Sequence, residues 1–158
     1  LFNDIKITDG LIFSSANAVY SPSYISLQTA LSIYNLIPET VYETTSVSTR
    51  KSNNFNNKLG RFTYKTVSPK VFWGYTIHNI NGYSILIAEI EKALLDFLYL
   101  YPQIDNEEDF FELRFNFGEF RNQSSEQKLN TYLNVFNKKS LSKRVKKFIS
   151  YHQENARN

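Results

Sequence analysis

Residues 73–101 read WGYTIHNINGYSILIAEIEKALLDFLYLY, and this stretch decides the fold. Its first part predicts a β-hairpin, with strands over residues 73–80 and 83–88 joined by Asn81-Gly82. An Asn-Gly pair supplies the positive φ angles that a type I′ turn requires. Residues 89–101 then repeat apolar side chains at helical spacing until a proline follows. The chain therefore changes from a strand-forming half to a helical half, which predicts the α+β class.

Upstream of the hairpin, the patterns predict a small mixed or antiparallel sheet packed with helices. Ser23 suits the N-cap of a helix over residues 23–34, because its hydroxyl can accept a backbone N–H. The polar, Asn-rich residues 51–58 predict a loop. The other expected elements are strands at residues 41–50 and 60–67, and a short strand at 5–7 followed by a turn at Asp9-Gly10 and residues 11–13.

Downstream of the hairpin, capping residues predict three more helices, so the C-terminal half is expected to be helical. Asn106 precedes three acidic residues, whose carboxylates oppose the positive end of a helix dipole. Ser124 or Ser125 suits the cap of a helix through about residue 137. Ser140 suits the cap of a last helix over residues 141–151.

The composition fits a single domain over residues 1–158, neither disordered nor fibrous. The absence of cysteine excludes disulfides and thiolate metal sites, which suits a cytoplasmic protein. The longest apolar run, residues 85–88, is far shorter than the roughly 20 residues of a membrane span, so we expect no membrane partner. The chain also has no methionine, and we therefore expect it to be a piece of a longer protein with material before Leu1.

The net charge of +3 hides a strong asymmetry along the chain. Residues 1–88 carry 7 basic and 4 acidic side chains, whereas residues 89–126 carry 3 basic and 10 acidic ones. Residues 127–158 carry 8 basic and 1 acidic side chain. A domain with an acidic middle and a basic end presents two different electrostatic surfaces to its partners.

The basic end falls on the last predicted helix and is a candidate nucleic-acid contact. A helix with a cationic side can neutralise backbone phosphates. The same pattern also fits an ordinary solvated helix face, which is the commoner case. The candidate residues are Lys139, Lys143, Arg144, Lys146 and Lys147.

The sequence Glu89-Ile90-Glu91-Lys92 follows a predicted strand and offers an alternative function. An acid–x–Lys pattern at a strand end is typical of restriction-type nucleases, in which carboxylates hold Mg²⁺ and the lysine orients a water. The competing interpretation is that Glu89 and Glu91 are favoured in the first helical turn by the dipole. Asp96 lies four residues after Lys92, so these two side chains can pair across one helical turn.

A polar strand over residues 44–51 is a candidate contact surface for phosphate or for a partner's carboxylate, because it carries hydroxyl groups and ends in Arg50-Lys51. It equally fits an edge strand kept soluble by Thr, Ser and terminal charge. No serine lies in a nucleophile elbow, and the chain has no Gly-rich phosphate loop and no HExxH motif. We therefore predict a protein that is not an enzyme, without catalytic residues, metal or cofactor.

In this order and spacing, several segments resemble the C-terminal domain of AbiEi-type antitoxins from abortive-infection toxin–antitoxin systems of type IV. The resemblance covers roughly residues 20–101. The segments that carry it are YSPSYISL at residues 20–27, YETTSVSTRK at 42–51, GRFTY at 60–64, FWGY at 72–75 and AEIEKALLD at 88–96.

The resemblance implies a bacterial transcriptional regulator of viral defence. Such proteins carry an N-terminal winged-helix domain that binds operator DNA, and we expect this domain to be absent from the present chain. Their C-terminal domain supports neutralisation of a nucleotidyltransferase-like toxin and sometimes aids DNA binding. For this chain we expect the partner-binding surface to be formed by Tyr24, Ser26, Thr49, Arg50 and Lys51.

Overall fold

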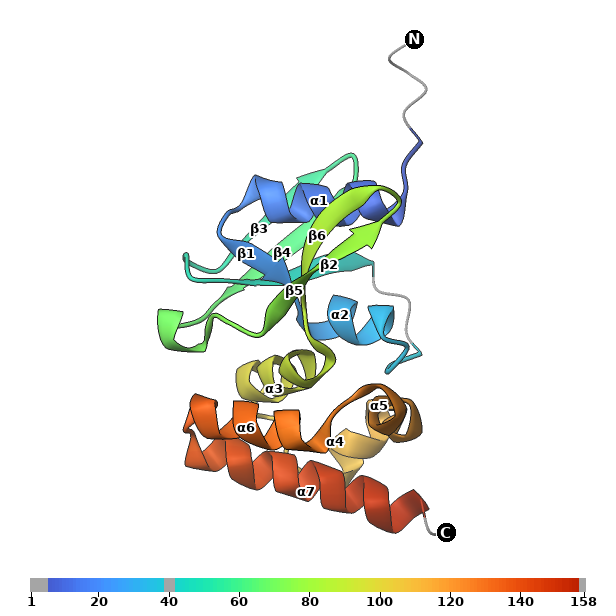
Figure 1. The fold of residues 1–158 in the computed structure, drawn as a ribbon, viewed down its shortest axis with the longest axis vertical. Coiled ribbons are helices and arrows are strands. Elements are labelled where there is room, and N and C mark those ends of the chain that lie inside the picture. Colours follow the sequence, from blue (N-terminus) through green and yellow to red (C-terminus); the bar gives the residue numbers. More distant parts are fainter. Residues whose placement is uncertain (1–5, 39–41, 157–158) are drawn as a thin grey trace.

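The computed structural model describes residues 6–38 and 42–156 and confirms the α+β class. A six-stranded mixed sheet occupies the N-terminal half together with two helices, and the C-terminal half is helical (Figure 1). The sheet with its helices forms one end of the molecule, and α4 to α7 form the other, with α3 between them. Among the described residues, no helix combines the length and the apolar character that a membrane crossing requires.

The strands lie in the order β3-β4-β2-β1-β6-β5. Two neighbouring pairs, β1 with β6 and β2 with β4, are parallel, and the other pairs are antiparallel. The strand bounds are β1 Ser23–Ile25, β2 Glu43–Ser48, β3 Asn53–Asn57, β4 Gly60–Thr66, β5 Tyr75–Ile80 and β6 Tyr83–Ala88. The helix bounds are α1 Asp9–Val19, α2 Leu27–Ile33, the 3-10 turn η1 Pro69–Val71, α3 Ile90–Leu100, α4 Glu107–Glu112, α5 Phe117–Gln123, α6 Glu126–Phe136 and α7 Lys139–Ala156.

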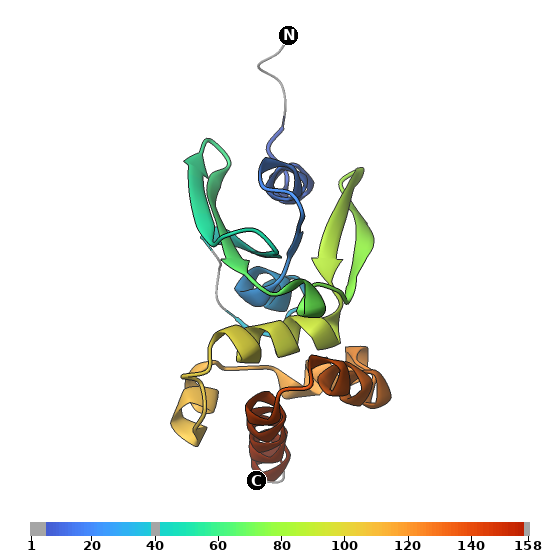
Figure 2. The same cartoon turned by 90° about the vertical axis from the view of Figure 1, so that its left-hand side faces the viewer.

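Helix α1 lies between two wings of the sheet, one made by β3 and β4 and the other by β5 and β6 (Figure 2). β6 pairs with β1 at Ile25 and Ile87. Beyond that bridge the Asn17 side chain of α1 forms the hydrogen bonds to the backbone of β6. Its Oδ1 accepts the Leu86 N–H at 2.8 Å, and its Nδ2 donates to the Leu86 carbonyl at 3.4 Å. Gly10 permits the close approach at the other end of α1, because a Cβ there would lie 2.2 Å from the Ile80 carbonyl oxygen.

Helix α3 is the centre of the core. Its residues from Ile90 to Leu98 are all buried, because α2 covers one side of it and α6 and α7 pack against the other. A helix enclosed in this way needs apolar residues around most of its circumference. The sequence supplies them except at Glu91, Lys92 and Asp96, which are buried as well.

The hairpin prediction is confirmed, with Asn81 and Gly82 at φ values of 54° and 84°. The predicted strands at 41–50 and 60–67 are confirmed as β2 and β4. The helices predicted after Asn106 and after Ser125 are also confirmed, and both side chains accept the expected backbone N–H.

Five predictions about local structure were wrong, and one helix was missed. The turn at Asp9-Gly10 is instead the start of α1, whose cap is Thr8. Ser23 begins β1, and the following helix starts only at Leu27. Residues 53–57 form β3 rather than a loop, since β4 pairs with them. α5 was not predicted, and Ser140 lies inside α7 instead of capping it. The strand expected at residues 5–7 is not seen at residues 6–7, and residue 5 lies outside the described residues.

His152 on α7 makes the stability of the helical end of the molecule depend on pH. Its ring stacks on Phe117, with centroids 5.2 Å apart, and contacts Phe115, Phe148 and Tyr151. Burial among these rings lowers the pKa of His152 from 6.5 to about 4. The unfolded chain therefore binds a proton on this residue between pH 6.5 and pH 4, whereas the folded chain does not.

We predict that the free energy of unfolding falls as the pH is lowered through this window. The part due to His152 is about 1–2 kcal/mol, less than the full shift implies because the ring is partly exposed to water. Urea unfolding at pH 7 and pH 4.5 measures it. His152→Phe should remove most of this pH dependence, and His78→Gln should remove less. Equal effects of the two substitutions would contradict the assignment.

Candidate functional site

Lys92 lies at the centre of a fully buried polar network. Its ammonium donates to Asp96 Oδ1 at 2.7 Å, to the Tyr24 hydroxyl at 2.8 Å and to the Val71 carbonyl at 2.8 Å. Asp96 Oδ2 accepts the hydroxyls of Tyr24 at 2.8 Å and Ser26 at 2.9 Å. All three protons of Lys92 and both oxygens of Asp96 are thus satisfied, as a buried ion pair requires.

Aromatic rings complete the enclosure of this network. The Lys92 ammonium lies 4.8 Å from the Trp73 ring centroid and 5.1 Å from that of Phe136, within the range of cation–π attraction. Gly74 permits this packing, since a Cβ there would lie 2.8 Å from Lys92 Cγ. Burial lowers the pKa of Lys92 and raises that of Asp96, and their mutual attraction opposes both shifts.

The network corrects one expectation about the partner-binding surface. Tyr24 and Ser26 are 0% exposed, so neither can contact a partner protein. Burial, followed by the nearby Asp96 charge, raises the pKa of Tyr24 well above its usual value of 10, which keeps its hydroxyl protonated as a donor. These two residues instead join the β1–α2 segment to α3.

We predict that Lys92→Met destabilises the protein by about 3–5 kcal/mol, because it leaves the Asp96 carboxylate buried without a counter-charge. Asp96→Leu should have a similar effect, because it leaves the Lys92 ammonium buried without a counter-charge. The double variant Lys92→Met/Asp96→Leu should be much more stable than the sum of the two single effects implies. Urea unfolding followed by circular dichroism measures all three. Simple additivity would show that the two charges do not depend on each other.

The carboxylates of Glu89 and Glu91 both bind groups of α6 or its N-cap, and they do not converge on one site. The Glu89 carboxylate accepts from Lys128 Nζ and from the Tyr132 hydroxyl, both at 2.6 Å. Burial acts to raise the pKa of Glu89, but these two hydrogen bonds and the Lys128 charge outweigh it, and the pKa lies below its usual value. Glu91 accepts the backbone N–H of Ser125 at 2.8 Å, at the start of α6.

The candidate nuclease residues therefore point to three different partners. Glu89 binds the side chains of α6, Glu91 binds its first backbone N–H, and Lys92 binds Asp96. In the described ranges, no three His, Cys, Asp or Glu side chains are grouped so that they could hold a metal ion. The dipole interpretation of the two glutamates agrees with their places, since Glu89 is the N-cap residue of α3 and Glu91 lies in its first turn.

The exposed part of the predicted partner surface is a fixed corner after β2. The Arg50 guanidinium carbon lies 4.1 Å from the centroid of the Tyr20 ring, and the Tyr20 hydroxyl donates to the Lys51 carbonyl at 2.8 Å. Arg50 and Lys51 are exposed, and Thr49 is half-buried beside them. This corner therefore presents two cations to solvent, one of them held in place by an aromatic ring.

A basic groove lies where α6 ends and α7 begins. Asn137, in the left-handed conformation with φ of 53°, reverses the chain there. The groove has a volume of about 350 Å³. Four exposed lysines line it, and no carboxylate of the described chain lies within 4 Å of their ammonium groups. We call this feature the lysine groove, and the lysines that define it are Lys138, Lys139, Lys143 and Lys146.

Three of the five predicted nucleic-acid contacts thus come together, and two do not. Arg144 is 8% exposed and donates to the Leu98 carbonyl, so it holds α7 on α3 and is not available to phosphate. Lys147 binds Asp105, with its ammonium 3.1 Å from Oδ1. The predicted contacts do not include Lys138, which lies one residue before α7 and lines the groove together with the other three lysines.

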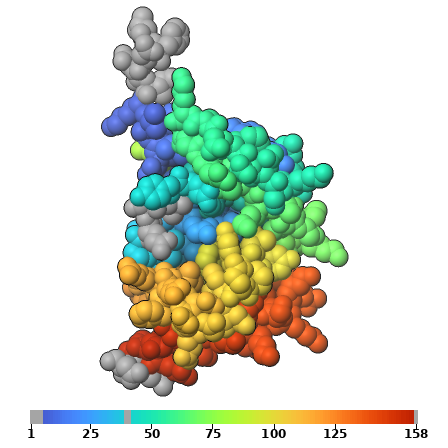
Figure 3. Space-filling model, turned by 180° about the vertical axis from the view of Figure 1, so that it is seen from behind, coloured from blue at the N-terminus to red at the C-terminus, as the bar shows by residue number. Residues whose placement is uncertain are grey.

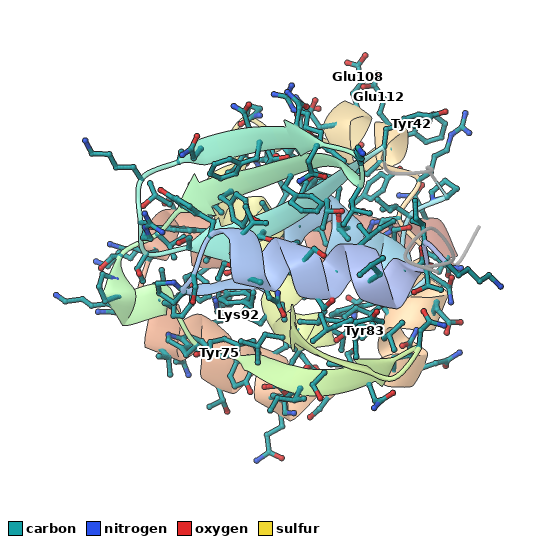
Figure 4. All side chains as sticks on the ribbon, turned by 90° about the horizontal axis from the view of Figure 1, so that it is seen from above. Tyr42, Tyr75, Tyr83, Lys92, Glu108 and Glu112 are labelled. Atoms are coloured by element: carbon teal, nitrogen blue, oxygen red, sulfur yellow. The ribbon has the colours of Figure 1, made fainter. Side chains whose placement is uncertain are left out.

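The charged surfaces lie on different parts of the molecule. The connection from β2 to β3, η1 and the α6–α7 junction lie on the left of Figure 1, the side that faces the viewer in Figure 2. These segments carry the Arg50 corner, Lys70 and the lysine groove. The acidic helix α4 belongs to the amber region in the space-filling view from behind (Figure 3). Glu108 and Glu112 point away from the molecule, whereas Lys92 lies in its interior (Figure 4).

Another pocket, of about 740 Å³, lies between α1, α2 and β2. Its charged lining is partly paired, with Arg61 Nε 3.3 Å from Glu43 Oε2. Its lining includes Pro38 and Tyr42, between which residues 39–41 lie outside the described residues, and we assign no function to it. A scan against models of protein families finds no match for this chain, and a search among curated proteins finds none either.

Proposed function

We propose that this chain is a non-enzymatic domain of an AbiEi-type antitoxin and transcriptional regulator, which supports neutralisation of a nucleotidyltransferase-like toxin and aids DNA binding. The observation that carries the DNA-binding part is the lysine groove, with four exposed cations that lack an acidic partner in the described chain. Operator DNA would be bound mainly by a winged-helix domain elsewhere in the protein, and the protein would act in the cytoplasm.

The position of the lysines supports a role in binding rather than in stability. Lys138 and Lys139 lie at the N-terminal end of α7, where the helix dipole is positive and cations are unfavourable. The first turn of α7 contains no acidic residue that would offset them. Four cations around a positive helix end repel one another, and a phosphate backbone would relieve this repulsion.

The Arg50 corner supports the toxin-binding part of the proposal. A guanidinium held over an aromatic ring is oriented before it meets its partner, so less conformational entropy is lost when it binds a carboxylate. Arg50, Lys51 and Thr49 remain in the proposed contact surface. The alternative function as a nuclease gains no support, because Glu89, Glu91 and Lys92 are each engaged by a different partner.

We predict that Lys139→Gln/Lys143→Gln weakens binding to duplex DNA and flattens its dependence on salt. Each lost phosphate contact should reduce the slope of log K against log[salt] by about 0.9, so the slope should change by nearly 2. Fluorescence anisotropy with a labelled duplex over a salt series measures this.

The matched control is Lys6→Gln/Lys58→Gln, which removes the same charge from two other exposed positions. It should leave the slope close to that of the unmodified chain. If both double variants change the slope equally, the effect comes from net charge alone and the lysine groove is not the contact.

Toxin recognition requires a separate experiment. A pull-down from the native host's lysate with this domain as bait should recover a nucleotidyltransferase-like protein, identified by mass spectrometry. The same experiment with Arg50→Gln should recover much less of it. If a folded bait captures no such protein, the direct-contact part of the proposal is wrong.

A further inference from the structure

A small apolar pocket lies between α2, the end of α3 and α4, and it shares no residue with the lysine groove. Its volume is about 310 Å³. Leu31 and Phe97 are buried in its lining, and Ile37, Ile104 and Leu113 are half-buried there. This volume is at the lower end of the range for ligand pockets, so the pocket suits one long side chain better than a larger ligand.

The polar groups of the lining are of two kinds. Gln28 and Tyr101 satisfy each other, since the Gln28 amide donates to the Tyr101 hydroxyl at 3.1 Å. Asp109 and Glu112 of α4 are carboxylates, and neither forms an ion pair with another residue of the described chain. The lining is therefore apolar, with two carboxylates on its α4 side.

Helix α4 carries more negative charge than its own stability requires. Residues 105–112 contain five acidic side chains and no basic one. The helix dipole accounts for the acids of the first turn, and Asp109 completes a capping box with Asn106. Glu112, however, is the last residue of α4, where the dipole is negative and a carboxylate is unfavourable. Its neighbour Phe111 is 72% exposed, so both side chains are available to a partner.

We propose that this pocket binds an arginine or lysine side chain from a basic segment of a partner protein. The aliphatic stem of that side chain lies against the apolar lining, and its charged head meets the Glu112 carboxylate. Glu108, Phe111 and Glu112 follow helical spacing and lie on one side of α4. Because Glu108 and Glu112 point away from the molecule, neighbouring residues of the same segment can reach a second carboxylate and an aromatic ring (Figure 4).

Charge decides which occupant fits. Carboxylates repel the phosphates of nucleic acid and the side chains of an acidic peptide. A purely apolar side chain would take water from the two carboxylates and give them no counter-charge. A long cationic side chain matches both the apolar lining and the carboxylates, because its stem and its head differ in the same way.

The position of Lys65 indicates where the partner's cation lies. The Lys65 ammonium is 4.7 Å from the centroid of the Tyr101 ring, so the lining already has one cation beside it. The head of the entering side chain is therefore expected at α4, next to Asp109 and Glu112. This surface is opposite in sign to the lysine groove and the Arg50 corner. The proposal goes beyond the proposed function and does not rest on it.

Fluorescence anisotropy with a labelled amphipathic peptide of arginine, leucine and alanine tests the site. The peptide should bind, and Glu108→Gln/Glu112→Gln should weaken its binding at least about tenfold. The matched control Asp9→Asn/Glu126→Gln removes the same charge from two exposed positions outside the pocket lining and should leave binding unchanged. Absence of binding, or equal effects of the two double variants, would overturn the proposal.

A second peptide separates the cation from the apolar contacts. Citrulline in place of arginine keeps the shape of the side chain without its charge, and this peptide should bind at least about tenfold more weakly. Addition of the arginine peptide should shift the methyl resonances of Ile104 and Leu113, and leave those of Leu133 in the lysine groove in place. Equal binding of the two peptides, or shifts centred on Leu133, would contradict the assignment.

Discussion

The buried contact between Lys92 and Asp96 is the interaction on which the rest of the structure depends. It lies in α3, which connects the two ends of the molecule: α2 packs on one side of α3, and α6 and α7 pack on the other. Through Tyr24, Ser26 and Val71 the same network fixes β1, the start of α2 and η1 against α3. Because every polar group in it is satisfied, the network sets one arrangement of these elements, and a shift of α3 would leave a charge unpaired.

This constraint decides where a partner can bind. Four residues have the sequence pattern that most resembles a catalytic site, and their side chains all bind other parts of the fold. They are Glu89, Glu91, Lys92 and Asp96. Two of the hydroxyls expected on the surface are used in the same way. Cations at the periphery remain exposed, namely the Arg50 corner and the lysine groove, and the segments that carry them lie on the same side of the molecule.

The parts of the fold that could be predicted are those with a strong local signal. Asn81-Gly82 marks the hairpin, and the 3.6-residue spacing marks α3, without help from distant residues. β1 could not be predicted because it has only three residues and is stabilised by neighbours on both sides. β3 is rich in asparagine, and only its pairing with β4 makes it a strand.

The candidate site was predictable to a similar extent. The run of lysines identified the α7 surface, but the sequence could not show that Arg144 and Lys147 face other partners, because helical spacing does not reveal what packs against a helix. The burial of Tyr24 and Ser26 depends on a carboxylate about 70 positions away in the chain. No local pattern carries that information.

The most direct test of this account is an NMR titration of the isotope-labelled chain with duplex DNA. We predict that amide resonances of the α6–α7 junction shift as DNA is added. Resonances of Glu89, Glu91 and Lys92 should stay unchanged, because their side chains are fully engaged within the fold. Shifts centred on these three residues, with the lysine groove unaffected, would contradict the account.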